Sequence, residues 1–140
     1  MHRSILRVPC LLLVGMTAAC GNDQTPTAPT ATTPTTATET FEGTVNRNGA
    51  NTHSFATRGG TVTATITTLS PDSAAVVGLS LGTWNGASCQ TVIANDRATQ
   101  GVTVVGTASG SGNLCVRLYD AAGDLAETAS YAVLVVHPPS

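Results

Sequence analysis

The sequence contains one pattern that can build a nucleophilic serine. Residues 78–82 read GLSLG, the form G-x-S-x-G with Ser80 at its centre, and Asp96, Asp120 and His137 follow it in the order Ser–Asp–His. Such a serine acts from a sharp elbow between a strand and a helix, beside N–H groups that stabilise an oxyanion. Here the strand-like run continues beyond the motif without helical periodicity, so we expect Ser80 to alternate outward between two leucines. The pattern therefore favours a protein that is not an enzyme, with a serine hydrolase through Ser80 as a remote alternative.

The histidines and the paired carboxylates are the next groups that could do chemistry. His53 lies in a short strand-like run, where we interpret it as a surface or pocket-edge side chain, and His137 precedes two prolines, where we expect it to be exposed. Asp120 and Asp124 flank a turn, but this turn lacks the alternating oxygen ligands and the distal glutamate of a calcium loop, so we favour a plain hairpin turn. We therefore expect no metal and no cofactor.

Trp84 is the only tryptophan, and it stands directly before the turn-forming pair Asn85-Gly86. A tryptophan that is exposed beside amide groups can stack on a sugar ring, whereas a buried one serves as a packing anchor. The buried anchor is the simpler interpretation. Trp84 and Asn85 nevertheless remain candidate contacts for an extracellular polysaccharide or a cell-wall polymer.

The four cysteines divide into two groups. Cys10 and Cys20 lie at the N-terminus, whereas Cys89 and Cys115 lie far along the chain and would stay oxidised in an exported protein. A bridge needs Cα atoms roughly 4.4–6.8 Å apart, so we expect strands that are neighbours or that meet across a sheet edge. Because Cys115 alternates away from the apolar residues beside it, we place the bridge near an edge or an end of the domain. It would be a structural disulfide that fastens the turn at 85–86.

Residues 1–19 have the composition of a signal peptide. Arg3 and Arg7 precede an apolar run over residues 8–16, which is too short to cross about 30 Å of hydrocarbon as a helix. The next residues, Thr17-Ala18-Ala19-Cys20, resemble the lipobox of bacterial lipoproteins. The resemblance implies cleavage before Cys20 and a diacylglycerol anchor on it, in a lipid bilayer. Because Gly21 and not an aspartate follows, it also implies the outer membrane or the cell surface. An ordinary signal peptide cleaved after Ala19 is the alternative.

Composition separates a linker from a folded domain. Residues 21–40 are almost entirely threonine, proline and alanine, so they carry too little apolar surface to fold, and we expect a disordered spacer that begins at Cys20. A chain that starts at Cys20 has four arginines and eight carboxylates, a net charge of 4 − 8 = −4, and no lysine. Without a basic surface to neutralise phosphates, nucleic acid is not an expected partner.

Short β-type runs, several of them alternating between apolar and polar residues and the last one apolar on both sides, are separated by turn residues and predict about eight strands between residues 41 and 137. No stretch has helical periodicity, and several strands have a single apolar face that must be buried against a second layer. We therefore predict an all-β fold, an antiparallel two-sheet sandwich that is jelly-roll-like, followed by a tail at 138–140. The expected strands cover residues 40–46, 52–57, 60–68, 75–83, 88–94, 101–107, 113–120 and 130–137.

Five segments of this domain follow a familiar order. They are residues 41–45 (FEGTV), 53–55 (HSF), 60–64 (GTVTA), 112–120 (GNLCVRLYD) and 131–133 (YAV). In this order they resemble the bacterial pre-peptidase C-terminal domain, a jelly-roll-like sandwich that is appended to secreted peptidases or stands alone in lipoproteins. The resemblance implies an accessory role in secretion or stability, or binding to an extracellular polymer or surface.

Calcium binding in that family uses clustered carboxylates at the start of the domain, where this chain has only Glu39 and Glu42 close together. The sequence therefore favours a membrane-anchored, exported lipoprotein with a non-catalytic structural or binding module. The alternatives are carbohydrate or cell-wall polymer binding around Trp84, and an accessory domain to a secreted peptidase. An extracellular polysaccharide or protein would be the partner.

Overall fold

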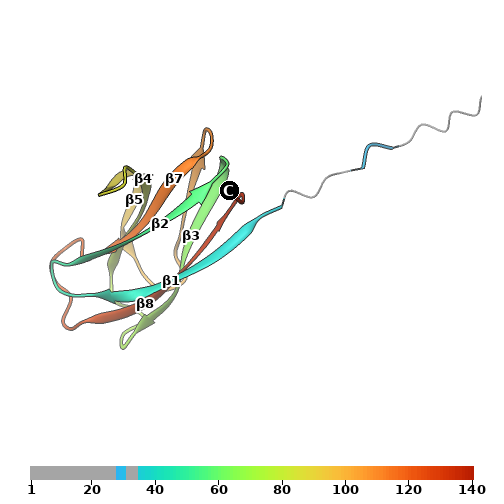
Figure 1. Ribbon diagram of the computed structural model, residues 1–140. Helices are drawn as coiled ribbons and strands as arrows, with labels where there is room; N and C mark the ends of the chain where they lie inside the picture. Colours follow the sequence, from blue (N-terminus) through green and yellow to red (C-terminus); the bar gives the residue numbers. More distant parts are fainter. Residues whose placement is uncertain (1–27, 31–34) are drawn as a thin grey trace, which may run out of the picture. The chain divides into compact units, whose positions relative to one another are not determined.

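The computed structural model describes residues 28–30 and 35–140 (Figure 1). The predicted leader, Cys20 and most of the predicted linker lie outside these residues. Among the described residues no helix is long and apolar enough to span a membrane. The folded part is all-β, with strands β1 (Ala37–Val45), β2 (Ala50–Thr57), β3 (Gly60–Ser70), β4 (Val77–Trp84), β5 (Cys89–Ala98), β6 (Thr103–Ala108), β7 (Gly112–Tyr119) and β8 (Ala129–His137).

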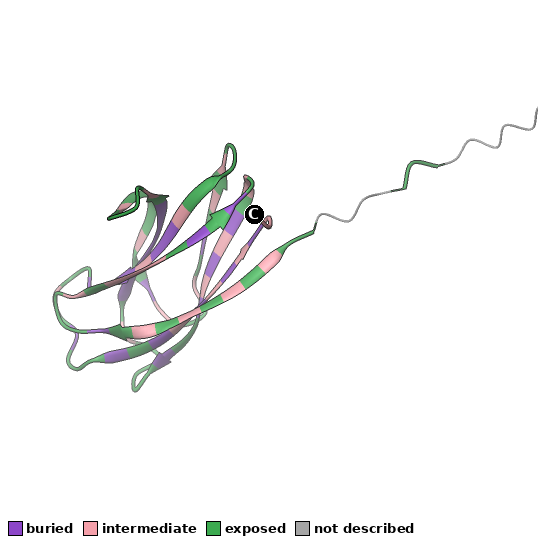
Figure 2. Ribbon diagram, viewed as in Figure 1, coloured by how far each residue is buried: buried purple, intermediate pink, exposed green. Residues whose placement is uncertain are grey.

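Alternation along the chain decides which side of each strand is buried. In β3, Val62, Ala64 and Ile66 are buried, whereas the threonines between them are exposed or half-buried. Successive strand side chains point to opposite faces, so the apolar set faces the second layer and the threonine set faces water. Figure 2 shows the same alternation of buried and exposed residues along several strands. The core therefore lies between the two sheets.

The strands form two antiparallel sheets of four strands each, in the orders β1-β8-β3-β6 and β2-β7-β4-β5. We call them sheet 1 and sheet 2. Only the connection from β4 to β5 stays within one sheet, and every other connection passes from one sheet to the other. This order is that of a jelly roll, in which two Greek keys wrap around one core. The predicted all-β, two-sheet architecture is confirmed.

Each strand runs between the same two ends of the sandwich. The end at which the chain enters β1 also holds the connections at 58–59, 85–88 and 109–111 and the C-terminus, and we call it the entry pole (Figure 1). The connections at 46–49, 71–76, 99–102 and 120–128 form the far pole. The entry-pole connections carry one charged side chain, whereas the far-pole connections carry five. They are Arg58 at the entry pole and Arg47, Asp72, Asp120, Asp124 and Glu127 at the far pole.

The start of the first strand and the nature of the turn at 120–124 differ from the predictions. The first strand begins at Ala37, where the sequence predicts linker up to residue 40, because Ala37 pairs with His137 on β8. The turn from Asp120 to Asp124 is not part of a hairpin, because β7 and β8 belong to different sheets. It belongs to a crossover between the sheets, and alternation within the strands could not reveal which sheet each strand joins.

Candidate binding site at the open edge of the sandwich

One lateral edge of the sandwich, between β1 and β2, is filled by aromatic side chains. The rings of Phe41 and His53 stack at 5.0 Å, and Phe41 lies 6.2 Å from the ring of Phe55. His53 Nε2 is 2.8 Å from the hydroxyl of Tyr131. Burial lowers the pKa of His53 and raises the pKa of Tyr131 to about 12, so burial favours the neutral form of both side chains, and the imidazole tautomer decides which of them donates. This edge is closed.

His137 belongs to the same closed edge, and its predicted exposure is wrong. Its side chain is 2% exposed, and its ring lies 4.9 Å from that of Phe55. Nδ1 lies 2.8 Å from the carbonyl of Pro138, and Nε2 lies 3.0 Å from Oε1 of Glu39. A carbonyl and a carboxylate both accept hydrogen bonds, so an N–H on either ring nitrogen of His137 has an acceptor within reach. The prolines that follow do not carry the ring into water, because β8 is paired with β1 through its last residue.

The opposite edge, between β5 and β6, is open. It holds a cleft of about 320 Å³. Three of the four large apolar side chains that are exposed in the described residues lie on its two strands, with Val92 76%, Ile93 40% and Val105 51% exposed. The cleft lining has aliphatic side chains, hydroxyls, an amide and glycines but no acid, base or histidine. The lining residues are Val62, Leu81, Gly82, Thr83, Val92, Ile93, Gly106, Thr107, Ala108, Ser109, Gly110, Ser111, Gly112, Asn113 and Leu114.

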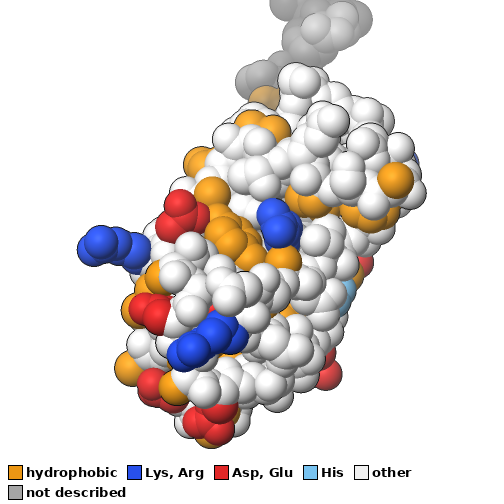
Figure 3. Space-filling view, turned by 90° about the vertical axis from the view of Figure 1, so that its left-hand side faces the viewer, with side chains coloured by type: hydrophobic (Ala, Val, Ile, Leu, Met, Phe, Trp, Pro, Cys, Tyr) orange, Lys and Arg blue, Asp and Glu red, His pale blue; other side chains and the backbone are white. Residues whose placement is uncertain are grey.

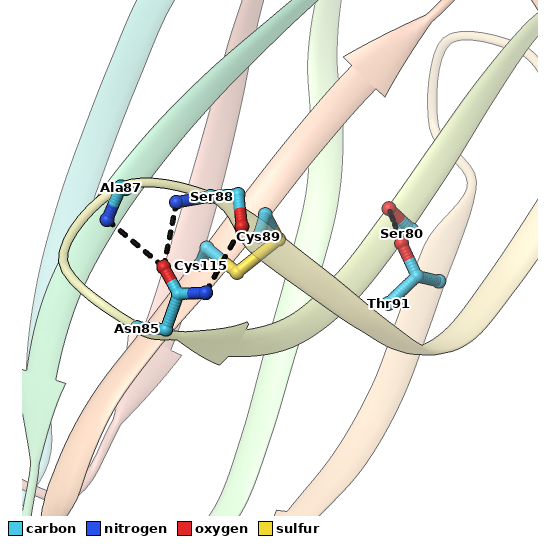
Figure 4. The surroundings of a disulfide bond; sticks show 7 residues. All are labelled: Ser80, Asn85, Ala87, Ser88, Cys89, Thr91 and Cys115. Carbon is cyan, nitrogen blue, oxygen red and sulfur yellow. Dashed lines mark hydrogen bonds between the residues drawn. A yellow bond between two sulfur atoms is a disulfide. The ribbon is translucent and has the colours of Figure 1, made fainter.

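The disulfide explains why this edge is open. Cys89 and Cys115 form the predicted bridge, with Cα atoms 5.8 Å apart, although β4 lies between β5 and β7. Strands two positions apart in a flat sheet are about 9.5 Å apart. The start of β5 therefore passes over the outer face of β4. Of the two arrangements that the sequence predicts, neighbouring strands or strands that meet across a sheet edge, the first is excluded, because β4 separates the edge strand β5 from β7. The predicted position beside the Asn85–Ser88 turn is confirmed (Figure 4).

Gly82 makes this crossing possible. A Cβ at Gly82 would lie 2.2 Å from the carbonyl oxygen of Gln90, so only glycine leaves room for β5 above β4. The β4–β5 register shifts at the same place, because Leu81 pairs with Ile93 while Gly82 pairs with Thr91. The shift is a bulge at Val92, whose side chain it leaves exposed. The start of β5 is thus displaced from beneath β6, and the inner sides of β4 and β7 line the cleft.

Ser80 is buried, not directed into water as the sequence predicts. It is 0% exposed, and its Oγ lies 3.5 Å from Oγ1 of Thr91 on the crossing strand (Figure 4). The aspartates and the histidine that follow Ser80 in the Ser–Asp–His order lie elsewhere. Asp96 accepts a hydrogen bond from the hydroxyl of Tyr119, Asp120 accepts backbone N–H groups at the far pole, and His137 pairs with Glu39. The structure does not bring Ser80, an aspartate and His137 together.

Trp84 and Asn85 lie apart from the cleft. Trp84 is half-buried at the end of β4, and it is not among the residues that line the cleft. Asn85 closes its own turn, because Oδ1 accepts the N–H groups of Ala87 and Ser88 at 2.9 and 2.8 Å (Figure 4). Its Nδ2 donates to Oγ of Ser88 at 3.1 Å. The amide that the sequence proposes as a ligand contact is thus occupied within the turn.

Asp120 organises the crossover at the far pole. Its burial alone would raise the carboxyl pKa, but the backbone N–H groups of Asn48, Leu125, Gly123 and Asp124 outweigh this effect and lower the pKa.

Among the described residues no three His, Cys, Asp or Glu side chains cluster as metal ligands would. On the face shown in Figure 3, arginines and carboxylates occupy the middle and lower parts, and the upper part is largely uncharged. The charged groups of the domain are therefore unevenly distributed.

No protein-family model and no curated relative matches this chain. Fold and site together define an eight-stranded jelly-roll domain with one closed edge and one open edge, whose cleft has no charged side chain in its lining. Sequence reasoning missed the open edge. The only signals for it are the charge-free run at residues 102–114 and the glycines within it.

Proposed function

We propose that this chain is an exported lipoprotein, anchored through Cys20, whose jelly-roll domain is a non-catalytic binding module. The observation that carries the proposal is the cleft at the β5–β6 edge. Its volume of about 320 Å³ falls within the range of small-ligand sites, which are mostly apolar with a few polar groups. Its lining has aliphatic side chains and hydroxyls but no ionisable group, and such a lining suits the binding of a ligand better than proton or group transfer.

The anchor is supported by the sequence before the domain. The resemblance of Thr17-Ala18-Ala19-Cys20 to a lipobox places the lipid on Cys20, and β1 begins at Ala37. The segment between them has 36 − 20 = 16 residues. A proline-rich chain of that length spans about 50 Å when it is extended. Such a spacer would hold the cleft clear of lipid headgroups, at the outer membrane or the cell surface.

The resemblance to the pre-peptidase C-terminal domain stays part of this proposal. The two four-stranded sheets support it at the level of architecture. Under this interpretation the module accompanies secreted proteins or extracellular polymers and has no chemistry of its own.

Cell fractionation tests the proposal. We expect the full-length chain, expressed in a Gram-negative host, to sediment with membranes, and Cys20→Ser to move into the soluble periplasmic fraction. Cys10→Ser is the matched control, because Cys10 lies in the leader and is removed; it should stay with the membranes. Membrane retention of Cys20→Ser equal to that of the original chain would contradict the anchor.

A further inference from the structure

The open edge of sheet 1 differs in charge from the edge strands β1 and β5, whereas β2, the edge strand at the closed side of the sandwich, also has no Asp, Glu, Lys or Arg. β1 carries Glu39 and Glu42, and β5 carries Asp96 and Arg97. β6 reads TVVGTA and has no charged residue. Native proteins protect edge strands with charges, prolines, bulges or a covering segment, since an unprotected edge can pair with another strand. β6 has no charge or proline, and no register shift interrupts its pairing with β3.

The hydrogen bonds of β3 show which backbone groups of β6 are free. Ile66 donates its N–H to the carbonyl of Val102 at 3.0 Å and accepts the N–H of Gly101 at 2.7 Å, so both backbone groups of Ile66 face the segment that leads into β6. Hydrogen-bonded pairs alternate along an antiparallel ladder, and Ala64–Val104 and Val62–Gly106 are therefore hydrogen-bonded pairs. The N–H and C=O groups of the residues between them then point away from β3. These residues are Thr103, Val105 and Thr107.

The cleft lies on the inner side of this same edge. The inner surface at Gly106 is within reach of β4 and β5, since a Cβ there would lie 3.6 Å from Leu81 Cδ1 and 3.7 Å from Ile93 Cγ2. Side chains of an added strand alternate between the two faces of the sheet. Every second side chain of a strand paired with β6 would therefore point towards the cleft, and the others would lie beside exposed Val105.

We propose that the β6 edge and its cleft bind an extended, uncharged polypeptide segment of another protein as a fifth strand of sheet 1. In this mode the main chain supplies affinity and pockets for alternate side chains supply selectivity. The segment must be uncharged, because the cleft has no ionisable group to pair with a buried charge. Small apolar and hydroxyl side chains match the lining. The inference rests on the proposed function as a binding module and names its partner.

The test uses the full chain in detergent and the probe acetyl-Gly-Ser-Val-Thr-Val-Ser-Gly-amide. We expect saturable binding, with backbone hydrogen exchange at Thr103, Val105 and Thr107 slowed about tenfold when the peptide is at ten times its Kd. Val105→Pro removes one outward N–H and no bond to β3, so it should weaken binding at least about tenfold. Val105→Thr keeps that N–H and should bind within about threefold of the original chain.

Several results would overturn this proposal. Equal binding by Val105→Pro and Val105→Thr would mean that the cleft takes a ligand without strand pairing. Protection that rises with protein concentration in the absence of peptide would identify a second copy as the occupant. Absence of any binding or protection would exclude the site. If Val105→Pro does not fold, Thr107→Pro removes the next outward N–H and serves instead. None of these outcomes depends on the lipid at Cys20, which fractionation tests separately.

Discussion

Gly82 is the residue on which the shape of the open edge depends. The carbonyl of Gln90 occupies the space of a Gly82 side chain, so Gly82→Ala must push β5 away from β4. We expect a loss of about 1–3 kcal/mol of unfolding free energy, the usual range for overpacking, and a melting temperature lower by about 4–8 °C per kcal/mol. Gly112→Ala is the control, because nothing lies within 4 Å of its Cβ position. Equal melting temperatures for the two variants would contradict the crossing.

The disulfide holds β5 at the same crossing, and it stabilises the fold by restricting the conformations that the unfolded chain can adopt. Cys89 and Cys115 are 26 residues apart in sequence, and a loop of that length corresponds to about 3.5 kcal/mol in the loop-entropy model. We expect the double variant Cys89→Ser/Cys115→Ser to lose stability of this order in urea unfolding while keeping its β-sheet circular dichroism. Unchanged stability would show that packing alone holds β5 over β4.

At the scale of elements, β1 is held to the domain by its pairing with β8, by Phe41 and by the contact of Glu39 with His137. Glu39 is 42% exposed, so the solvent weakens this contact. We expect Glu39→Gln to cost about 1 kcal/mol in urea unfolding, because it leaves a buried imidazole without its carboxylate. Glu42→Gln, on the exposed face of the same strand, should have no measurable effect. Equal losses would show that the contact contributes nothing specific.

The elements also show what sequence reasoning can and cannot predict. All eight strands follow from short β-type runs between turn residues, because this signal is local. In β3, Val62, Ala64 and Ile66 also define the buried face without reference to any other strand. The burial of His137 and Ser80 is not local. It depends on β1 covering the end of β8 and on β5 crossing β4, and these contacts join residues far apart in the chain. The pairing of Cys89 with Cys115 was predictable by counting the cysteines that remain after the leader and Cys20. The position of β4 between their two strands was not predictable.

At the scale of the whole molecule, ionisable groups that are buried or half-buried make the free energy of unfolding depend on pH. The folded pKa of His53 is lowered from 6.5 and that of Asp120 from 3.8. A lowered pKa means that the unfolded chain binds protons more readily. Both groups therefore contribute stability above these values, and the contribution is lost as pH falls, first for His53 below about 6.5 and then for Asp120 below about 3.8.

Thermal melts between pH 8 and pH 3 measure this effect. We expect the melting temperature to fall between pH 7 and pH 5, and His53→Gln to flatten that part of the curve. In the opposite direction, Tyr131 has its pKa raised from 10.0 to about 12, so its contribution is present below pH 10 and lost as pH rises from 10 towards 12. A melting temperature that rises on acidification from pH 7 to pH 5 would contradict a half-buried His53 whose pKa is lowered in the folded domain.

The central claim is that this jelly-roll domain is displayed at a membrane by a lipid on Cys20. Mass spectrometry of the mature protein, purified from membranes of a bacterial host, tests it most directly. We predict a chain that lacks residues 1–19 and begins with Cys20 carrying diacylglycerol. An unmodified chain that begins at Cys20 and is recovered from the medium would contradict the claim.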